Sequence, residues 1–150
     1  MTNWICKKFS ELTVDELYAI LRLRSEVFVV EQNCVFLDID NKDQHSHHLM
    51  GWQGGQLAAC SRILPAGISY EESSIGRIVS SPSLRGKGIG KTLVMESIRT
   101  LYALYGKGKI RIGAQLYLKG FYESFGFFQA GDIYLEDGIE HIEMLLLSKD

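Results

Sequence analysis

The sequence predicts an α+β domain in which helices flank a mixed, mostly antiparallel sheet. Two observations predict this class: apolar runs of strand length outnumber stretches of helical spacing, and the elements follow the order β-α-β-β-β-α-β-α-β-β. A doubly wound parallel sheet would need a helix after almost every strand, and this chain has too few helices for it. Because the order contains no internal repeat and no linker, we expect a single domain over residues 1–150.

The first half of the chain is expected to form four strands and one helix. Thr13 and Glu16 have the spacing of a capping box, and apolar residues recur at helical spacing from there to about Val29. Gly54-Gly55 between two apolar runs is typical of a β-hairpin. Residues 33–47 carry acids and histidines without periodicity, so we expect a hydrated polar loop. The expected strands span residues 4–9, 48–53, 56–64 and 74–80.

The second half is expected to form two helices and three strands. A long amphipathic helix runs from about Gly88 to Tyr105, where Gly106 suits the left-handed position after a helix end. The last two strands meet at Asp137-Gly138, which is a typical turn pair. The expected strands span residues 109–115, 127–135 and 139–147, and a short helix spans residues 118–125.

The composition is that of a soluble globular chain, with 150 residues, 46% hydrophobic and 23% charged. The net charge of −2, from 16 Lys+Arg and 18 Asp+Glu, argues against a nucleic-acid or anionic-membrane partner, because both require a positive excess. The sequence shows no apolar run of membrane-spanning length. We expect no secretory leader, because the first residues lack an apolar h-region and a cleavage site. Cys6, Cys34 and Cys60 are odd in number and widely spaced, so we expect free thiols and a cytoplasmic location.

The segment Arg85-Gly-Lys-Gly-Ile-Gly-Lys91 follows a predicted strand and opens a predicted helix. Its glycines let a ligand approach the backbone closely, and the start of a helix offers free N–H groups and a positive dipole end. Arg85, Lys87 and Lys91 add positive charge on the same turn. These features predict a phosphate or pyrophosphate site. The simpler alternative is a glycine-rich turn that only caps the helix.

Two familiar phosphate motifs do not fit this segment. A Walker A loop ending in Gly90-Lys91-Thr92 would need glycine at the position of Arg85. The dinucleotide fingerprint G-x-G-x-x-G fails because Gly86, Gly88 and Gly90 are evenly spaced. The pattern [Q/R]-x-x-G-x-[G/A] does fit, with Arg85, Gly88 and Gly90 in its fixed positions.

Together with Gly113-Ala-Gln115 and Gly120-Phe-Tyr-Glu-Ser-Phe-Gly-Phe127, this loop resembles the Gcn5-related N-acetyltransferase (GNAT) superfamily. The resemblance covers nearly the whole chain. A narrower similarity, to the ElaA-type branch of bacterial acetyltransferases, rests on three further segments. These are Arg24-Ser-Glu-Val-Phe-Val-Val-Glu-Gln-Asn-Cys34, Asp38-Ile-Asp40 and Glu136-Asp-Gly-Ile-Glu-His141.

The resemblance implies the acyl-CoA N-acyltransferase fold and an N-acetyltransferase that moves the acetyl group of acetyl-CoA to a primary amine by direct attack. The acceptor is then a small-molecule amine or a protein amine. Backbone groups of residues 78–80 would pair with the pantetheine arm, so that the unusual Ser80, where the superfamily has a small apolar residue, matters little. The implied cofactor-binding residues are Ile78, Val79, Ser80, Arg85, Gly86, Lys87, Gly88, Ile89, Gly90 and Lys91.

The resemblance also points to two catalytic side chains. It implies that Tyr122 lies near the thioester, where its hydroxyl can protonate the leaving thiolate; the alternative is a core aromatic residue. Because the acceptor amine arrives protonated near neutral pH, a base is needed as well. Glu31, Asp40 and His141 are candidates around the acceptor cleft, and we select Glu31. A solvated surface role is the alternative for each of these three.

No metal is expected. Six acids and histidines lie close together, but an EF-hand would need glycine at position 43 and glutamate at 49, where the chain has Asp43 and Leu49. A single His45-x-His47 pair is a weak metal signal. The six residues are Asp38, Asp40, Asp43, His45, His47 and His48.

Two other functions compete with acetyl transfer. A non-catalytic acyl-CoA-binding sensor would retain the loop and lack turnover. A nucleotide hydrolase built on Gly90-Lys91-Thr92 is disfavoured by Arg85 and by the absence of a second acidic motif on an apolar strand. The sequence leaves open the acceptor, the use of other acyl groups and the oligomeric state, a homodimer included.

Overall fold

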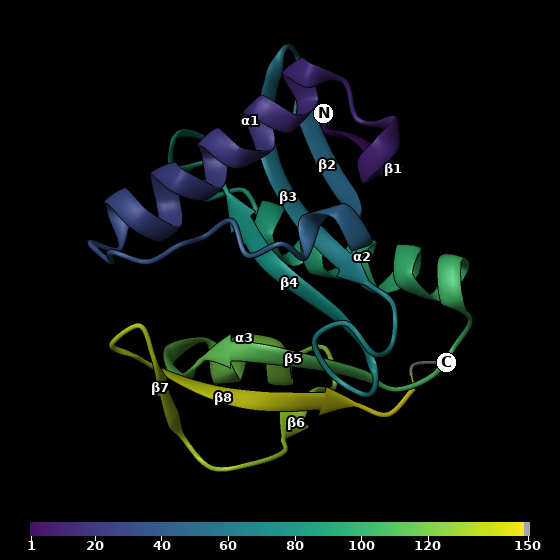
Figure 1. The fold of residues 1–150 in the computed structure, drawn as a ribbon, viewed down its shortest axis with the longest axis vertical. Coiled ribbons are helices and arrows are strands. Elements are labelled where there is room, and N and C mark those ends of the chain that lie inside the picture. The colour runs from purple at the N-terminus through teal and green to yellow at the C-terminus, as the bar shows by residue number, and fades with distance from the viewer. Residues whose placement is uncertain (149–150) are drawn as a thin grey trace.

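The computed structural model describes residues 1–148, in which eight strands form one mixed sheet (Figure 1). The strand order is β1-β2-β3-β4-β5-β8-β6 with β7 paired to β8, and among the described strands only β4 and β5 pair in parallel. This confirms the α+β class and the mostly antiparallel sheet. The strands are β1 (Asn3–Lys8), β2 (His47–Gln53), β3 (Gln56–Leu64), β4 (Ser73–Ser80), β5 (Ile110–Gln115), β6 (Phe128–Gln129), β7 (Tyr134–Glu136) and β8 (Ile139–Leu146). The helices are α1 (Val14–Arg24), a π-helix (Ser25–Glu31), α2 (Ile89–Tyr105) and α3 (Lys119–Glu123).

The helices cover both faces of the sheet, with α1 on one face and α2 and α3 on the other (Figure 1). Ile20 and Leu23 of α1 pack in one buried cluster with Val79 of β4. Leu93 of α2 and Tyr122 of α3 belong to a larger cluster on the opposite face. Burial of each leucine-sized side chain contributes about 1.5–3 kcal/mol, so these clusters hold both helical layers on the sheet. Within residues 1–148, no helix is long and apolar enough to span a bilayer.

The helix predicted between Thr13 and about Val29 is present, but it changes character partway. Its capping box is confirmed: Thr13 Oγ1 accepts from the Glu16 amide at 3.1 Å, and Glu16 Oε1 accepts from the Thr13 amide at 2.8 Å. After α1, the turns widen to the π type, in which the Gln32 amide donates to the Val27 carbonyl five residues back at 3.1 Å. Such turns are rare and occur often at functional sites.

The long strand predicted over residues 127–135 is wrong, because two short strands, β6 and β7, take its place. Gln129 pairs with Met144, and Tyr134 pairs with His141. Residues 130–133 lie between these two pairs on one side, but only residues 142–143 lie between them on β8. The segment 130–133 is therefore too long to stay paired, and it loops out of the sheet. The other predicted strands and helices are present, with ends shifted by two residues or fewer apart from the π-helix.

After a short parallel contact, β4 and β5 diverge (Figure 1). In the described chain they pair only at Ser73 with Ile110 and at Ser74 with Arg111, although both strands continue. A bulge in β4 accompanies the divergence, since the register against β3 shifts and Arg77 has a φ of 48°, in the left-handed region that favours glycine. The diverging strands leave a gap in the sheet, and the backbone edges of both strands face it.

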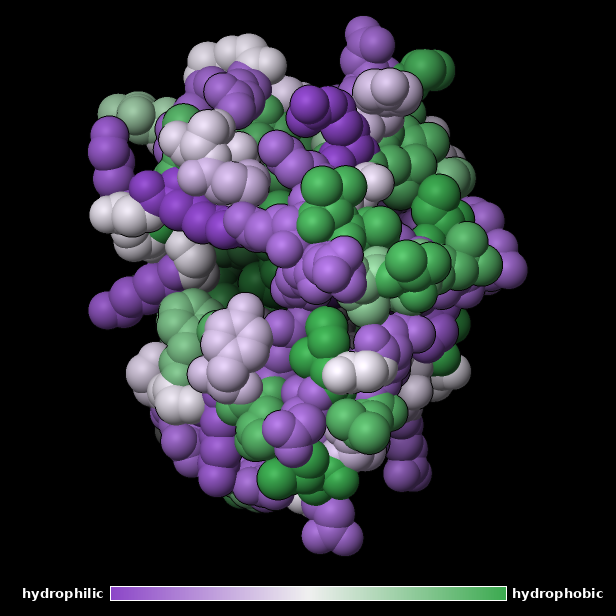
Figure 2. All heavy atoms as spheres, turned by 90° about the vertical axis from the view of Figure 1, so that its left-hand side faces the viewer, coloured by the Kyte–Doolittle hydropathy of each residue, from purple (hydrophilic) through white to green (hydrophobic). Residues whose placement is uncertain are grey.

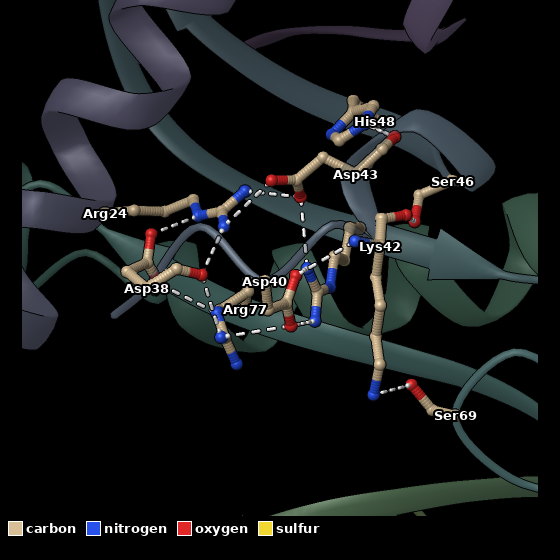
Figure 3. Close-up of polar contacts among 10 residues, drawn as sticks. Arg24, Asp38, Asp40, Lys42, Asp43, Ser46, His48, Ser69 and Arg77 are labelled. Atoms are coloured by element: carbon tan, nitrogen blue, oxygen red, sulfur yellow. Dashed lines mark hydrogen bonds and ion pairs between the residues drawn. The ribbon is translucent and has the colours of Figure 1, made fainter. Parts of the chain in front are cut away.

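The loop predicted over residues 33–47 is present, but it is not hydrated as predicted, because its acids form a buried ion-pair network (Figure 3). Asp38 accepts from Arg24 Nε at 2.9 Å and from Arg77 Nε at 2.7 Å. Arg24 belongs to α1 and Arg77 to the bulge of β4, so Asp38 ties both elements to the loop. The contact with Asp38 also supports the strained conformation of Arg77, which persists only where the surroundings hold it.

Asp43 and Asp40 complete the network from the same loop (Figure 3). Asp43 accepts from Arg24 Nη1 at 2.8 Å and from Arg62 Nη1 at 3.1 Å, and Asp40 accepts from Arg62 Nη2 at 2.6 Å. Burial alone would raise the pKa of Asp43, but hydrogen bonds and charge from Arg24 and Arg62 outweigh it and lower that pKa. The Asp43 carboxylate is therefore charged at neutral pH, and it supplies negative counter-charge to both Arg24 and Arg62.

The substitution Asp43→Asn is expected to lower the free energy of unfolding by about 3–5 kcal/mol, because it leaves buried guanidinium groups short of counter-charge. Urea denaturation followed by circular dichroism measures this change. The matched control is Glu26→Gln, which breaks the exposed pair with Arg22 and should cost less than about 0.5 kcal/mol. Equal, small effects of both variants would show that the network does not stabilise the fold.

Candidate active site

A cavity of about 640 Å³ lies in the gap between β4 and β5. Its wall includes Val27 and Phe28 of the π-helix, on the α1 side, and Leu93 and Tyr122 on the side of α2 and α3. Because its lining comes from both helical layers, the cavity passes through the sheet. Figure 2 views the molecule from the side on which α1 ends and β7 turns into β8, and shows a hollow with apolar atoms inside it.

The glycine-rich loop lies at the cavity, which Gly90 helps to line. Gly88 is the N-cap of α2 with a φ of 74°, and among residues 1–148 no side chain caps this helix end. The N–H groups of the first turn therefore have no partner within the helix. A Cβ placed at Gly86, Gly88 or Gly90 would meet no described atom within 4 Å, and Lys87 and Lys91 are exposed beside them. The loop thus presents N–H groups and positive charge to open space.

Five of the ten predicted cofactor-binding residues line the cavity, and the other five lie in the loop and the first turn of α2. The side chain of Ile89 is buried in the core, so only its backbone can contact a ligand. Binding by all ten stays a prediction. The lining residues are Ile78, Val79, Ser80, Arg85 and Gly90, and the others are Gly86, Lys87, Gly88, Ile89 and Lys91.

Tyr122 borders the cavity and is also part of the core. Its side chain is only 6% exposed, and its ring makes edge contacts with Phe121 and Phe127 at centroid distances of 5.2 and 6.1 Å. Burial, with a smaller contribution from Tyr117, raises the pKa of Tyr122 above its usual value. The phenol therefore keeps its proton at neutral pH, which a proton donor requires.

Glu31, at the end of the π-helix, forms a bidentate ion pair with Arg85 of the glycine-rich loop. Arg85 Nη2 and Nη1 donate to the two carboxylate oxygens at 2.7 and 2.8 Å. Hydrogen bonds from Arg85 hold the pKa of Glu31 below its usual value, so Glu31 is a weak base in this arrangement. Glu31 also competes with any bound anion for Arg85. Its role as the catalytic base stays a prediction.

The substitution Glu31→Gln separates these two roles. Exposed ion pairs contribute about 0.2–1 kcal/mol, so loss of the competitor should tighten acetyl-CoA binding by up to about fivefold in calorimetry. A base would show a different effect, namely a fall in kcat by about 10²–10⁴-fold. Glu26→Gln, on the same π-helix, is the control and should change neither quantity. Unchanged affinity and unchanged kcat in Glu31→Gln would remove both roles.

The other two candidate bases differ in position. Arg62 and Arg77 outweigh the effect of burial on Asp40 and hold its pKa far below its usual range, so Asp40 cannot take a proton near neutral pH. Asp40 is also absent from the cavity lining, whereas His141 of β8 is part of it. The side chain of His141 is buried, and Nδ1 lies 2.8 Å from the Ile139 carbonyl oxygen.

Several cavity residues were not predicted from the sequence. Gln115 Nε2 donates to Gln32 Oε1 at 3.1 Å and ties β5 to the residue after the π-helix. The Cys34 thiol donates to the Asp137 carbonyl at 3.3 Å, which joins the loop after the π-helix to the β7–β8 turn. The sequence signal for the β7–β8 turn was Glu136-Asp-Gly, which is part of the segment that resembles the family. The same tripeptide is also typical of an ordinary turn, so it did not indicate a cavity residue. These contacts close the cavity on the side of His141.

The acids and two of the histidines of residues 38–48 have partners within the chain. The acids form ion pairs with arginines, and His48 Nε2 donates a hydrogen bond to the Asp43 carbonyl oxygen at 2.9 Å. Within residues 1–148, no three histidine, cysteine or acidic side chains are grouped as metal ligands. Independence from metal stays a prediction.

Known proteins share this fold. A family profile described as an acetyltransferase (GNAT) domain matches residues 20–148. The chain is 42% identical over 146 residues to protein ElaA of Escherichia coli K12, covering 96% of this chain and 95% of that one. The crystal structure of E. coli ElaA superposes with a TM-score of 0.91 at 40% identity, covering 97% and 99% of the two chains.

Two further solved structures are similar. An acyl-CoA N-acyltransferase from Pseudomonas aeruginosa superposes with a TM-score of 0.93 at 40% identity, again covering 97% and 99% of the two chains. A Bacillus subtilis acetyltransferase, solved in complex with CoA, has the same fold with a TM-score of 0.67 at 23% identity, covering 98% and 99%.

Proposed function

Because the chain belongs to the GNAT acetyltransferase family and has the acyl-CoA N-acyltransferase fold, we propose that it moves the acetyl group of acetyl-CoA to a primary amine by direct attack. One observation carries the proposal: a cavity passes through the sheet between β4 and β5, with an uncapped glycine-rich helix start at its edge and the buried Tyr122 in its wall. The acceptor is a small-molecule amine or a protein amine.

Binding of acetyl-CoA uses two features of the chain. The free edge of β4 at residues 78–80 offers backbone groups to an extended arm, as a sheet edge does to an added strand. The first turn of α2, with Arg85, Lys87 and Lys91, offers N–H groups and positive charge to a pyrophosphate. The B. subtilis acetyltransferase of the same fold was solved in complex with CoA, which supports CoA as the class of ligand.

The chemistry needs one nucleophile and one leaving group. The amine nitrogen forms a bond to the thioester carbonyl carbon, the carbon–sulfur bond breaks, and the thiolate leaves with the bonding pair. Tyr122, whose place in the cavity wall suits the role, then gives its proton to the thiolate sulfur. The N–H proton that the new amide nitrogen loses restores the phenol. Neither a metal nor a covalent enzyme intermediate takes part in this scheme.

Thiol release from acetyl-CoA tests the proposal across a panel of amines: a polyamine, an amino sugar, an amino acid and a peptide N-terminus. Release that depends on one of these amines supports an enzyme. Acetyl-CoA binding without release in the presence of every amine would instead identify a non-catalytic sensor. Cys6, Cys34 and Cys60 are free thiols, which suits a reducing compartment, and the proposal therefore includes the cytoplasm as the site of action.

A further inference from the structure

A second titratable group borders the cavity from the face of the sheet opposite Tyr122. His141 of β8 pairs with Gln115 of β5, and the next pair is Ile142 with Ala114. Directly paired residues share a face of the sheet and neighbouring pairs alternate. Ile142 and Ala114 belong to the buried cluster that contains Tyr122, so His141 lies on the other face. Both His141 and Tyr122 nevertheless line the same cavity, because the cavity passes through the sheet.

Its hydrogen bond determines which nitrogen of His141 carries the proton. Nδ1 lies 2.8 Å from the Ile139 carbonyl oxygen, and a carbonyl can only accept, so Nδ1 is the protonated nitrogen. The neutral ring then has its lone pair on Nε2. This nitrogen lies 3.6 Å from a carboxylate oxygen of Glu136, and the ring stacks on Tyr134 at 5.8 Å. The ring is therefore held in one orientation, with a proton acceptor beside a negative charge.

We propose that His141 is the base that takes the proton of the acceptor amine, with Glu136 stabilising the imidazolium that forms. The inference rests on the proposed acetyl transfer and deepens it. An acceptor ammonium is attracted to the wall formed by Glu136 and Asp137, two acids that line this part of the cavity. His141 Nε2 takes one proton of the ammonium, and the freed nitrogen bonds to the carbonyl carbon as the carbon–sulfur bond breaks. Tyr122 gives its proton to the departing thiolate, and the second N–H proton, lost by the new amide nitrogen, restores the Tyr122 phenol.

Each side of the cavity then has one proton-transfer group: His141 accepts a proton from the amine, and Tyr122 donates a proton to the thiolate. The groups that face or flank His141 are Glu136 and Tyr134 from β7, Gln115 from β5, and Glu140 and Glu143 along β8. Gln115 is neutral, Tyr134 is held neutral because burial and nearby acids raise its pKa, and the remaining groups are acids. Glu143 is paired with Arg111 of β5 at 3.0 Å, which leaves Glu136 as the acid within 4 Å of Nε2.

The substitution His141→Gln tests the role. For an aliphatic amine, whose pKa is about 10.4, kcat/KM near neutral pH should fall by about 10²–10⁴-fold. For an aromatic amine such as aniline, which is unprotonated at neutral pH, the loss should be smaller. The loss for the aliphatic amine should also shrink as the pH approaches 10. Calorimetry should give the wild-type affinity for acetyl-CoA, which shows that the variant is folded.

A second variant and a spectrum keep the test decisive. Glu136→Gln changes a side chain that is 58% exposed, and it should raise KM for the aliphatic amine without unfolding the chain, because it removes a negative charge from the wall that attracts the ammonium. The ¹⁵N spectrum of the wild-type imidazole should show the proton on Nδ1. A proton on Nε2, or an equal loss with both kinds of amine, would overturn the inference. Absence of transfer by the wild-type protein to every amine would overturn the proposed function, and this inference with it.

Discussion

Tyr122→Phe is expected to lower kcat by about 10²–10⁴-fold, which is the usual contribution of a positioned acid. The substitution removes one hydroxyl and keeps the ring contacts with Phe121 and Phe127, so the thermal stability should change little. KM for acetyl-CoA should change much less than kcat, because the glycine-rich loop supplies most of the binding. That pattern identifies an interaction made chiefly in the transition state.

Tyr117→Phe is the matched control for this measurement. Tyr117 lines the same cavity, but it is 74% exposed, and loss of its hydroxyl should leave kcat unchanged. Steady-state thiol release with one good acceptor measures both variants. If Tyr122→Phe also has the wild-type kcat, the tyrosine is only a core residue and the thiolate leaves without its help.

Gly90→Glu is expected to weaken acetyl-CoA binding by at least about 100-fold, or about 2.8 kcal/mol. The carboxylate would occupy the open space above the first turn of α2 and repel a pyrophosphate there. The fold should be unaffected, since a Cβ at this position meets no described atom within 4 Å and an acid in the first turn of a helix is stabilising. Gly88→Asp should weaken binding too, but its φ of 74° adds backbone strain.

Calorimetry with a parallel thermal melt separates binding from folding in this experiment. Gly90→Ala is the control, because it adds a Cβ without charge and should keep most of the affinity. Gly90→Glu protein that melts like the wild type and binds acetyl-CoA normally would show that the loop does not bind the pyrophosphate.

The parts of the fold that were predicted correctly depend on signals between close neighbours in the sequence. Thr13 and Glu16 cap α1 from three residues apart, and Gly54-Gly55 joins β2 to β3 directly. The glycine-rich loop before α2 is equally local, since its helix-start geometry depends on its own residues. For such elements, spacing and turn chemistry are sufficient.

The ion-pair network could not be predicted in this way, because its partners are far apart in the sequence. Asp38, Asp40 and Asp43 look like residues of a solvated loop until Arg24, Arg62 and Arg77 are placed around them by α1, β3 and β4. One signal was available: Arg62 interrupts the most continuously apolar strand of the chain, and a buried arginine needs a carboxylate.

The acceptor side of the cavity was predicted only in part, for a similar reason. His141 was one of three candidates, and only the register of β8 against β5 and β7 shows that it lines the cavity beside Glu136. The residues that loop out between β6 and β7, which the prediction of a single strand over residues 127–135 did not include, set the register of β6 against β8. The position of Glu31 against Arg85 likewise depends on the π-helix, for which the sequence has no periodic signature.

The fate of the acetyl group tests the central claim most directly. Isotope-labelled acetyl-CoA, incubated with the wild-type protein and an amine that supports thiol release, should give one acetylated amine for each CoA thiol, as measured by mass spectrometry. The Gly90→Glu protein should give neither product at the same concentrations. Thiol released with free acetate in place of an acetylated amine would contradict transfer to an amine, and labelled acetyl-CoA that stays bound and intact with every amine would contradict catalysis.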